Sequence, residues 1–156
     1  MAISERLAGY LHDQAVTFDV VAHRHTASSL ETAHAAHVSG DRLAKTVVLE
    51  DDSGYLLAVL PATCRLDLGE LHRRLNRPLG LATESEVARL FEDCEPGAVP
   101  AFGAAYGLET VVDERLAEEP DVYVEAGDHE RLVHLSGEDF DALLEDASRA
   151  TFSRHL

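Results

Sequence analysis

The chain has 156 residues, 46% of them apolar and 27% charged, with a formal net charge of −16 at pH 7. This length suits one domain with a proper core, and we expect a single domain over residues 1–156. No apolar run approaches the roughly 20 residues of a bilayer-spanning helix, and the first residues lack the apolar centre of a signal peptide. We therefore expect a cytoplasmic protein with no membrane partner. The acidic charge argues against broad electrostatic binding of nucleic acid.

The N-terminal part of the chain predicts two helices and a strand. Residues 4–14 have apolar side chains at helical spacing, and Ser4 is a suitable N-cap. Residues 17–22 alternate and are β-branched, which favours a strand. A second helix begins after Ser28, which has an acid three residues later in capping-box spacing, and we place its end at Gly40.

The next segment predicts a buried β-hairpin. Lys45 is the only lysine among the 13 Lys and Arg residues, and it starts an apolar, β-branched run. The turn Asp51-Asp-Ser-Gly54 follows, and then the apolar run 55–60. Both runs are apolar nearly throughout, so we expect both faces to be covered and the pair to be central in the sheet.

Two short helices are predicted at residues 67–75 and 83–91, each opened by a capping-box pair, with a short strand at 79–82 between them. This region also holds the local basic cluster, which consists of Arg65, His72, Arg73, Arg74 and Arg77.

The C-terminal part begins with the largest irregular region, residues 93–107, in which prolines and glycines exclude regular structure. Strands are then predicted at 109–113, 121–125 and 131–135, and a last helix begins after Ser136. The connections between consecutive strands are too short for parallel crossovers. We therefore predict an α+β fold with a mixed, largely antiparallel sheet and surrounding helices.

Three segments carry a family resemblance, and they occur in a fixed order: Arg42-Leu-Ala-Lys-Thr-Val-Val-Leu49, Glu95-Pro-Gly-Ala-Val-Pro-Ala-Phe102 and Ala126-Gly-Asp-His-Glu-Arg-Leu132. Together they resemble the YbaK/prolyl-tRNA-synthetase editing-domain family, over nearly the whole chain. Members of that family hydrolyse mischarged aminoacyl-tRNA. The resemblance implies the same α+β architecture.

The resemblance also implies the site residues. Lys45 matches the family lysine at the terminal adenosine of the substrate, and Gly97 matches the glycine of the Gly-x-x-Pro loop. Amides around Gly97 and Ala98 are expected to stabilise the oxyanion, because glycine lets the main chain approach a ligand closely. The residues expected to bind the substrate are Thr46, Val99, Pro100 and His129. The competing interpretations are that Lys45 is an ordinary surface lysine, that the loop at Gly97 is a structural turn, and that His129 is an exposed turn histidine without a role.

Other chemistries have weaker support. His23 and His25 share one side of a strand and His34 and His37 share a helix face, but no carboxylate or cysteine spacing completes a metal site. We expect no metal and no cofactor. Cys64 is distant from the other cysteine in sequence, and two free thiols are the expected state in a reducing compartment.

The sequence thus predicts a freestanding aminoacyl-tRNA deacylase that removes a small amino acid, with tRNA for proline as the expected carrier. Lys45 followed by Thr46 resembles the cysteine-removing branch, whereas the loop at Gly97 and the segment at His129 resemble the alanine-removing branch. The expected partner is the acceptor end of aminoacyl-tRNA, and an aminoacyl-tRNA synthetase is an open second partner. The rival interpretation is a non-catalytic binding module with the same fold, which the acidic charge favours.

Overall fold

The computed structural model describes residues 3–156. Its five helices are α1 (Glu5–Asp13), α2 (Ser29–Ala36), α3 (Leu68–Leu75), α4 (Glu84–Leu90) and α5 (Gly137–Leu143). Three short 3-10 helices are η1 (Gly40–Arg42), η2 (Gly103–Tyr106) and η3 (Glu114–Glu118). The strands are β1 (Asp19–Ala22), β2 (Leu43–Asp51), β3 (Gly54–Pro61), β4 (Cys64–Leu66), β5 (Gly80–Leu81), β6 (Glu109–Asp113), β7 (Asp121–Glu125), β8 (Arg131–Ser136), β9 (Ser148–Ala150) and β10 (Ser153–His155).

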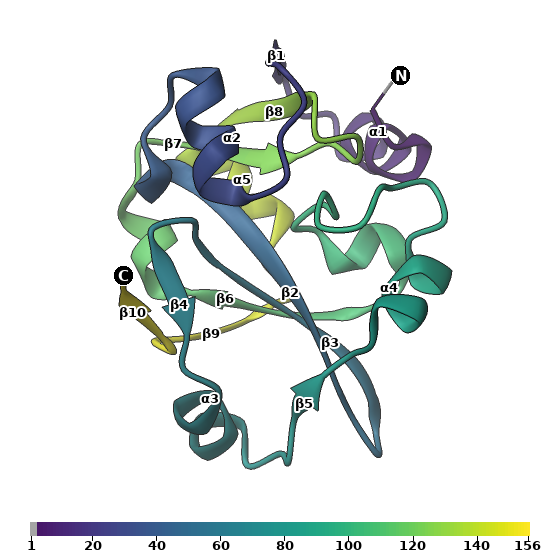
Figure 1. Ribbon diagram of the computed structural model, residues 1–156, viewed down its shortest axis with the longest axis vertical. Helices are drawn as coiled ribbons and strands as arrows, with labels where there is room; N and C mark the ends of the chain where they lie inside the picture. The colour runs from purple at the N-terminus through teal and green to yellow at the C-terminus, as the bar shows by residue number, and fades with distance from the viewer. Residues whose placement is uncertain (1–2) are drawn as a thin grey trace.

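The main sheet has the order β1-β8-β7-β2-β3-β6-β9, with β5 paired to β2, and β10 and β4 form a separate pair (Figure 1). The neighbours β1–β8, β8–β7, β2–β3 and β2–β5 are antiparallel. The parallel pairs β2–β7, β3–β6 and β6–β9 join strands that are far apart in the chain. The predicted α+β fold with a mixed, largely antiparallel sheet is confirmed, and the hairpin β2–β3 is central in it.

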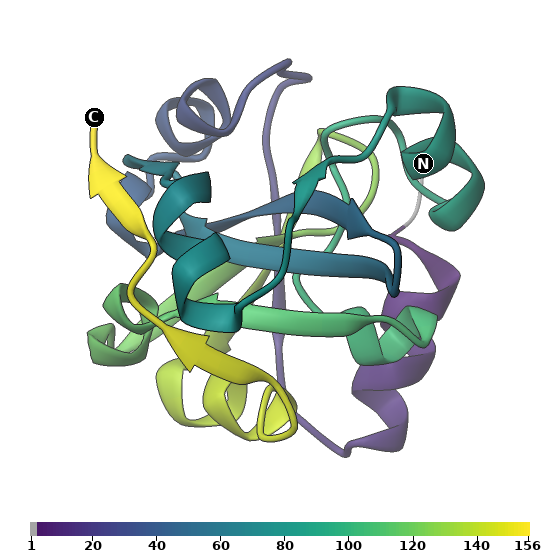
Figure 2. The same ribbon diagram turned by 90° about the horizontal axis from the view of Figure 1, so that it is seen from below.

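Helices cover both faces of this sheet. Successive side chains of a strand point to opposite faces, and in β2 the residue Ala44 belongs to the core cluster that contains Leu7 of α1 and Phe140 of α5. Its neighbour Leu43 packs on the other face with Ala33 of α2. Figure 2 shows α1 and α5 on one side of the central strands and α2 on the other.

Most predicted helix starts are confirmed by their N-caps. The side chains of Ser4, Ser28, Asp67, Thr83 and Ser136 each accept a hydrogen bond from a backbone N–H three residues later. Only the cap at Thr83 forms the full reciprocal box, with Glu86. These bonds satisfy amide groups that the first helical turn leaves free.

The predicted end of the second helix at Gly40 is wrong. The helix ends at Ala36, and His37 takes the left-handed C-cap conformation with φ 57°. Gly40 begins η1 instead, where a Cβ would lie 2.8 Å from Cγ2 of Thr63. Glycine at this position therefore serves close packing. The sequence also gave no signal for β4, β9 and β10, because three residues are too few for an alternation pattern.

Candidate active site

The site lies where two parallel strands separate. β2 and β7 pair only at Leu43–Tyr123 and Ala44–Val124. β7 then ends at Glu125, whereas β2 continues to Asp51. Lys45 and Glu125 are the first residues beyond the paired segment. By the alternation of side chains they lie on the same face as Leu43 and Tyr123.

Lys45 is half-buried, and it forms no ion pair or side-chain hydrogen bond within residues 3–156. Burial lowers the pKa of Lys45, and the nearby Cys64 acts in the opposite direction. A partly desolvated cation is normally paired, because removing a charge from water is unfavourable unless a partner compensates. An anionic ligand would supply that partner, so the interpretation of Lys45 as an ordinary surface lysine fits this environment poorly.

Thr46 points to the opposite face from Lys45, because the two are adjacent on one strand. Its Oγ1 is buried and has no hydrogen-bond partner within residues 3–156. The two neighbours therefore do not line one wall side by side.

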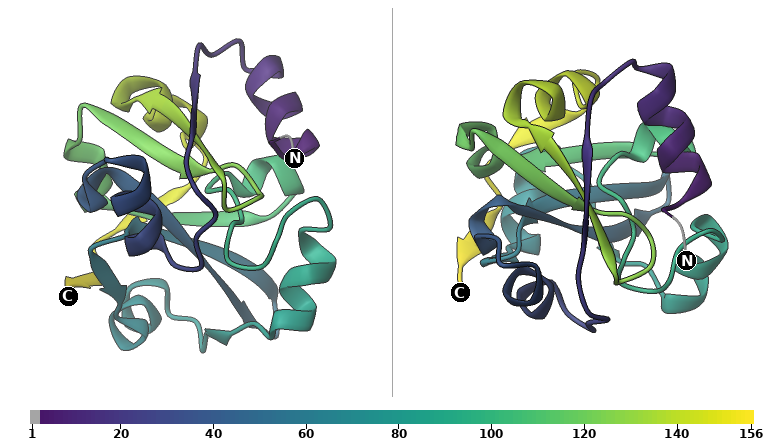
Figure 3. Two further views of the ribbon diagram at one scale, coloured as in Figure 1. Left: turned by 45° about the horizontal axis from the view of Figure 1, so that its top comes forward. Right: turned by 90° about the horizontal axis from the view of Figure 1, so that it is seen from above.

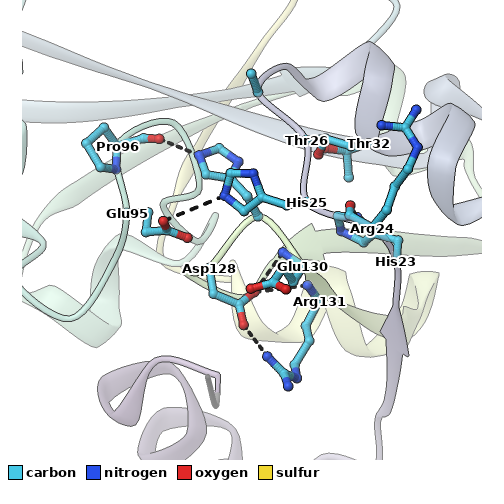
Figure 4. A network of polar contacts seen from close by, with 12 residues as sticks. His23, Arg24, His25, Thr26, Thr32, Glu95, Pro96, Asp128, Glu130 and Arg131 are labelled. Carbon is cyan, nitrogen blue, oxygen red and sulfur yellow. Dashed lines mark hydrogen bonds and ion pairs between the residues drawn. The ribbon is translucent and has the colours of Figure 1, made fainter.

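The turn after β7 is fixed by its own side chains. Gly127 has φ +112°, and a Cβ there would lie 3.3 Å from the Cys94 sulfur. The Oδ1 of Asp128 accepts from the amides of Glu130 and Arg131, each at 2.9 Å, and its Oδ2 pairs with the Arg131 guanidinium (Figure 4). This turn is rigid because its carboxylate satisfies both the backbone and a cation.

Three segments that are distant in the chain meet at this turn (Figure 3). The Glu95 amide donates to the Gly127 carbonyl at 2.7 Å, which joins the long loop before β6 to the turn. The Thr26 amide donates to the His129 carbonyl at 3.3 Å, which joins the chain between β1 and α2. β2 pairs with β7 just before this point. The three segments that carry the family resemblance, in β2, in the loop and in the turn, therefore surround the end of β7.

His129 is buried, with 7% of its surface exposed, so the interpretation of an exposed turn histidine is wrong. Its backbone has φ +59°, which aims the ring toward the loop. Nε2 lies 2.5 Å from the Pro96 carbonyl oxygen, which only accepts, so Nε2 carries the proton. Nδ1 is buried without a partner within residues 3–156, and the ring of His25 meets His129 edge-on with the ring centroids 5.5 Å apart.

Gly97 lies directly beside this ring. It has φ +82°, and a Cβ would lie 3.3 Å from His129 Cε1. Ala98, Val99 and Pro100 are buried behind it. The Ala98 amide donates to the Glu95 carbonyl at 3.1 Å, so the expected oxyanion donor is engaged in a turn. The amides of Gly97 and Val99 form no hydrogen bond within residues 3–156, and they are the donors that remain.

Sequence reasoning missed Glu125. Its side chain is buried, with 3% exposed, and burial together with the charge of Asp128 raises its pKa to about 8, against an opposing hydrogen bond from Thr32. The carboxyl is therefore protonated near neutral pH. Its Oε2 has no hydrogen-bond partner within residues 3–156. The available signal was an acid at the end of an apolar strand, directly before the matching segment Ala126-Gly-Asp-His.

A polar network anchors the other end of the loop to the N-terminal helix. Ser4 donates to Asp93 at 2.5 Å, and the Tyr106 hydroxyl donates to the same carboxylate at 2.8 Å. Burial raises the pKa of the adjacent Cys94 thiol to about 12, which keeps it protonated. Cys94 therefore does not act as a nucleophile here, and the network has a structural role. Both cysteines are free thiols.

The comparison with known proteins agrees with this arrangement. A sequence model of the aminoacyl-tRNA editing domain matches residues 23–143, which include all three segments. The chain belongs to the aminoacyl-tRNA editing domain family. No curated protein sequence matches this editing domain closely enough to count as a relative.

Solved structures share its fold over nearly the full chain. A proposed trans-editing enzyme for prolyl tRNA synthetase is 28% identical with a TM-score of 0.84, over 96% of this editing domain and 95% of that chain. A structure from work on epitope backbone grafting onto scaffold proteins is 25% identical with a TM-score of 0.83, over 97% of this chain and 96% of that chain. A proposed signal transduction protein from Marinobacter aquaeolei VT8 is 28% identical with a TM-score of 0.76, over 95% of this chain but 30% of that one.

The basic cluster of this editing domain carries less free charge than the sequence suggests. Arg73 and Arg74 both pair with Glu70, at 2.6 and 2.9 Å. Arg77 pairs with Asp51 at 2.7 Å and with a second carboxylate at 3.2 Å. Arg65 is exposed and has no ion pair within residues 3–156. These partners leave only a small positive footprint for nucleic acid.

The editing domain also has a cavity of about 570 Å³ that lies away from Lys45. It is lined by Tyr10, Leu108, Leu143 and the acids Glu145 and Asp146, among others. A cavity with this lining repels phosphate, so we assign the site by its chemistry and not by volume. Among residues 3–156, no three potential ligand side chains converge on a metal position, and the expectation of a metal-free site stays a prediction. None of the helices in that range has the length and apolar character needed to cross a bilayer.

Proposed function

We propose that this editing domain is a freestanding aminoacyl-tRNA deacylase that works in trans in the cytoplasm. Its substrate is a small mischarged amino acid, alanine or cysteine, esterified to tRNA for proline. Family membership and the trans-editing relative support the general activity. The choice of amino acid rests on the mixed resemblance of the motifs to the alanine-removing and cysteine-removing branches.

The observation that carries this proposal is Lys45, a half-buried cation without an ionic partner in the described chain. The terminal adenosine of tRNA brings the phosphate that such a cation lacks. A lysine suits this role because its ammonium is a compact donor on a flexible stem. Phosphate binding at Lys45 would place the 3′ end of the tRNA at the end of the β2–β7 ladder.

The ester then needs a positioned water and donors for the developing oxyanion, because the aminoacyl ester is already activated. The free amides of Gly97 and Val99 are the oxyanion donors in this proposal. His129 holds their loop through Pro96 and thereby acts as a positioning residue. The resemblance implies that a free hydroxyl of the terminal adenosine assists the attacking water, so the protein contributes chiefly position and electrostatics.

A panel of aminoacylated tRNAs tests the proposal. We expect the pure protein to hydrolyse alanyl- or cysteinyl-tRNA for proline and to spare prolyl-tRNA. The Lys45→Met variant keeps the apolar stem and loses the charge, so it should lose this activity while remaining folded. Wild-type protein that spares every mischarged ester would overturn the proposal.

A non-catalytic binding module is the second candidate, and the net charge of −16 favours it. The similarity to the proposed signal transduction protein also fits this candidate, because the shared fold covers only 30% of that longer chain. This candidate predicts binding of a ligand at Lys45 without turnover, so the same panel separates the two functions.

A further inference from the structure

Glu125 is a buried carboxyl that the proposed chemistry does not use. Its exposed fraction is 3%, and Oε2 meets no hydrogen-bond donor within residues 3–156. Buried polar atoms in folded proteins are almost always paired. Packing alone does not explain a glutamate here, because an apolar side chain would fill the same space without burying an unpaired polar group. The orphaned oxygen therefore points to a ligand that brings a donor.

The position of Glu125 restricts that ligand. It is the last residue of β7, one residue beyond Val124, and it lies on the same sheet face as Lys45, which is one residue beyond the paired Ala44. A ligand whose phosphate meets Lys45 therefore extends toward Glu125. The chain continues from Glu125 into the turn that bears His129, whose ring adjoins Gly97.

The donors of an aminoacyl-tRNA end are a ribose hydroxyl, the adenine amino group and the α-amino group, and of these only the α-amino group carries a positive charge that matches a carboxylate. The phosphates and the ester oxygens accept, and they carry or develop negative charge. The α-ammonium has three donors and a positive charge, and it lies next to the ester carbonyl. A carboxylate that pairs with it forms a charge-assisted hydrogen bond, which is stronger than a neutral one.

We infer that Glu125 binds the α-amino group of the aminoacyl ester and so makes the site selective for esters with a free amine. This inference rests on the proposed deacylase function and adds a substrate requirement to it. In the free protein the carboxyl is protonated, since burial and Asp128 raise its pKa. When the ammonium form binds, the carboxyl proton leaves to solvent and a carboxylate–ammonium pair remains.

Several charged and titratable groups surround this pair. Asp128 is neutralised by Arg131, and Lys45 is the cation on β2. His129 and His25 complete the surroundings, and His25 lies 3.7 Å from a Glu95 oxygen. Lys45 is itself a cation and Asp128 already pairs with Arg131, so we assign the ammonium to the carboxyl of Glu125.

The test compares alanyl-tRNA with propionyl-tRNA, in which hydrogen replaces the α-amino group and the size is almost unchanged. Each enzymatic rate is divided by the spontaneous hydrolysis rate of the same ester, because the amine itself activates the ester. Wild type should prefer the alanyl ester by roughly tenfold to a hundredfold in kcat/KM, the range for one hydrogen bond to a charged group. Glu125→Gln should lose this preference by slowing only on the alanyl ester, and Glu118→Gln, an exposed control, should keep it.

The outcomes separate this inference from the proposed function. Equal corrected rates of wild type on the two esters would overturn the role of Glu125 while the deacylase function stands. A Glu125→Gln variant that loses both activities equally would show a structural role, which also overturns the inference. If that variant does not fold, the wild-type comparison of the two esters still decides. No hydrolysis of either ester would overturn the proposed function, and the inference with it.

Discussion

The ring Nε2 of His129 lies 2.5 Å from the carbonyl oxygen of Pro96. This bond joins the turn after β7 to the loop before β6, and a Cβ at position 97 would lie 3.3 Å from Cε1 of the same ring, which is a tight contact. The loop is therefore held at Pro96 by a histidine and at Asp93 and Tyr106 by the polar network with Ser4. A loop fixed in this way presents its amides in one orientation, as transition-state stabilisation requires.

Gly97 tests that arrangement. Gly97→Val should lower the deacylation rate by about a hundredfold to a thousandfold, the range for loss of one oxyanion donor, because its side chain collides with His129. Gly107 provides a matched control, since it has φ +68° and no atom within 4 Å of a Cβ. Gly97→Ala and Gly107→Ala should lose similar stability, about 1 kcal/mol or more, because both adopt a strained backbone. Only the change at Gly97 should lower activity, and a folded, fully active Gly97→Val protein would make the loop a simple turn.

Substitutions at Lys45 should lower activity without lowering stability. Lys45→Ala and Lys45→Met should lower kcat/KM by about a hundredfold or more, because the transition state loses its phosphate-positioning cation. Lys45→Arg should not restore activity, since the guanidinium is larger and planar. Lys45→Met should leave the free energy of unfolding unchanged or raise it, because the cation is partly desolvated without a partner.

The measurements for Lys45 are steady-state kinetics and urea unfolding of the same preparations. Arg115→Ala removes an exposed arginine on η3 and should leave both quantities near those of wild type. A Lys45→Ala enzyme with wild-type turnover would remove the basis of the proposed function.

Glu125 predicts a pH dependence of stability. Its pKa is raised from 4.5 to about 8 in the folded protein. Between these values the native state keeps a proton that the unfolded chain has lost, so stability falls as pH rises through this window and levels off above it. The total effect is of the order of a few kcal/mol. Glu125→Gln stays neutral, so its stability relative to wild type should increase from about pH 5 to about pH 9.

Urea unfolding of both proteins across that range measures this difference. Curves of stability against pH that run parallel for wild type and Glu125→Gln would show that Glu125 is ionised in the native state. Glu118→Gln is the control for an exposed carboxyl and should follow the wild-type curve.

The ion pairs of the arginines predict a shallow salt dependence of tRNA binding. Each phosphate neutralised on a single strand contributes about −0.7 to the slope of log affinity against log salt. If Lys45 at the site and Arg65 of the basic cluster are the two cations that contact phosphate, we expect a slope of about −1.4, and Lys45→Met should reduce it by about 0.7. A salt titration with aminoacylated tRNA measures both slopes. A much steeper slope would reveal a broad basic face, in conflict with the pairing of Arg73, Arg74 and Arg77.

The sequence by itself determined the main elements and the residues of the site segments. Periodicity located the helices and the strands 109–113 and 121–125, and the capping pairs fixed the helix starts, because these signals arise between residues three or four positions apart. The ordered motifs around Lys45, Gly97 and His129 indicated the family for the same reason: each motif is local.

Only the tertiary structure decided how these segments act on one another. The buried state of His129, the engaged amide of Ala98 and the ion pairs of the arginines all depend on contacts between distant residues. Glu125 is the clearest case. A glutamate is ordinarily ionised and exposed, and the local signal, an acid at the end of an apolar strand, does not show that this one is buried. Its neutral carboxyl, whose Oε2 has no hydrogen-bond partner within residues 3–156, results from the meeting of β7, α2 and the Asp128 turn, since burial and the Asp128 charge exist only once the chain has folded.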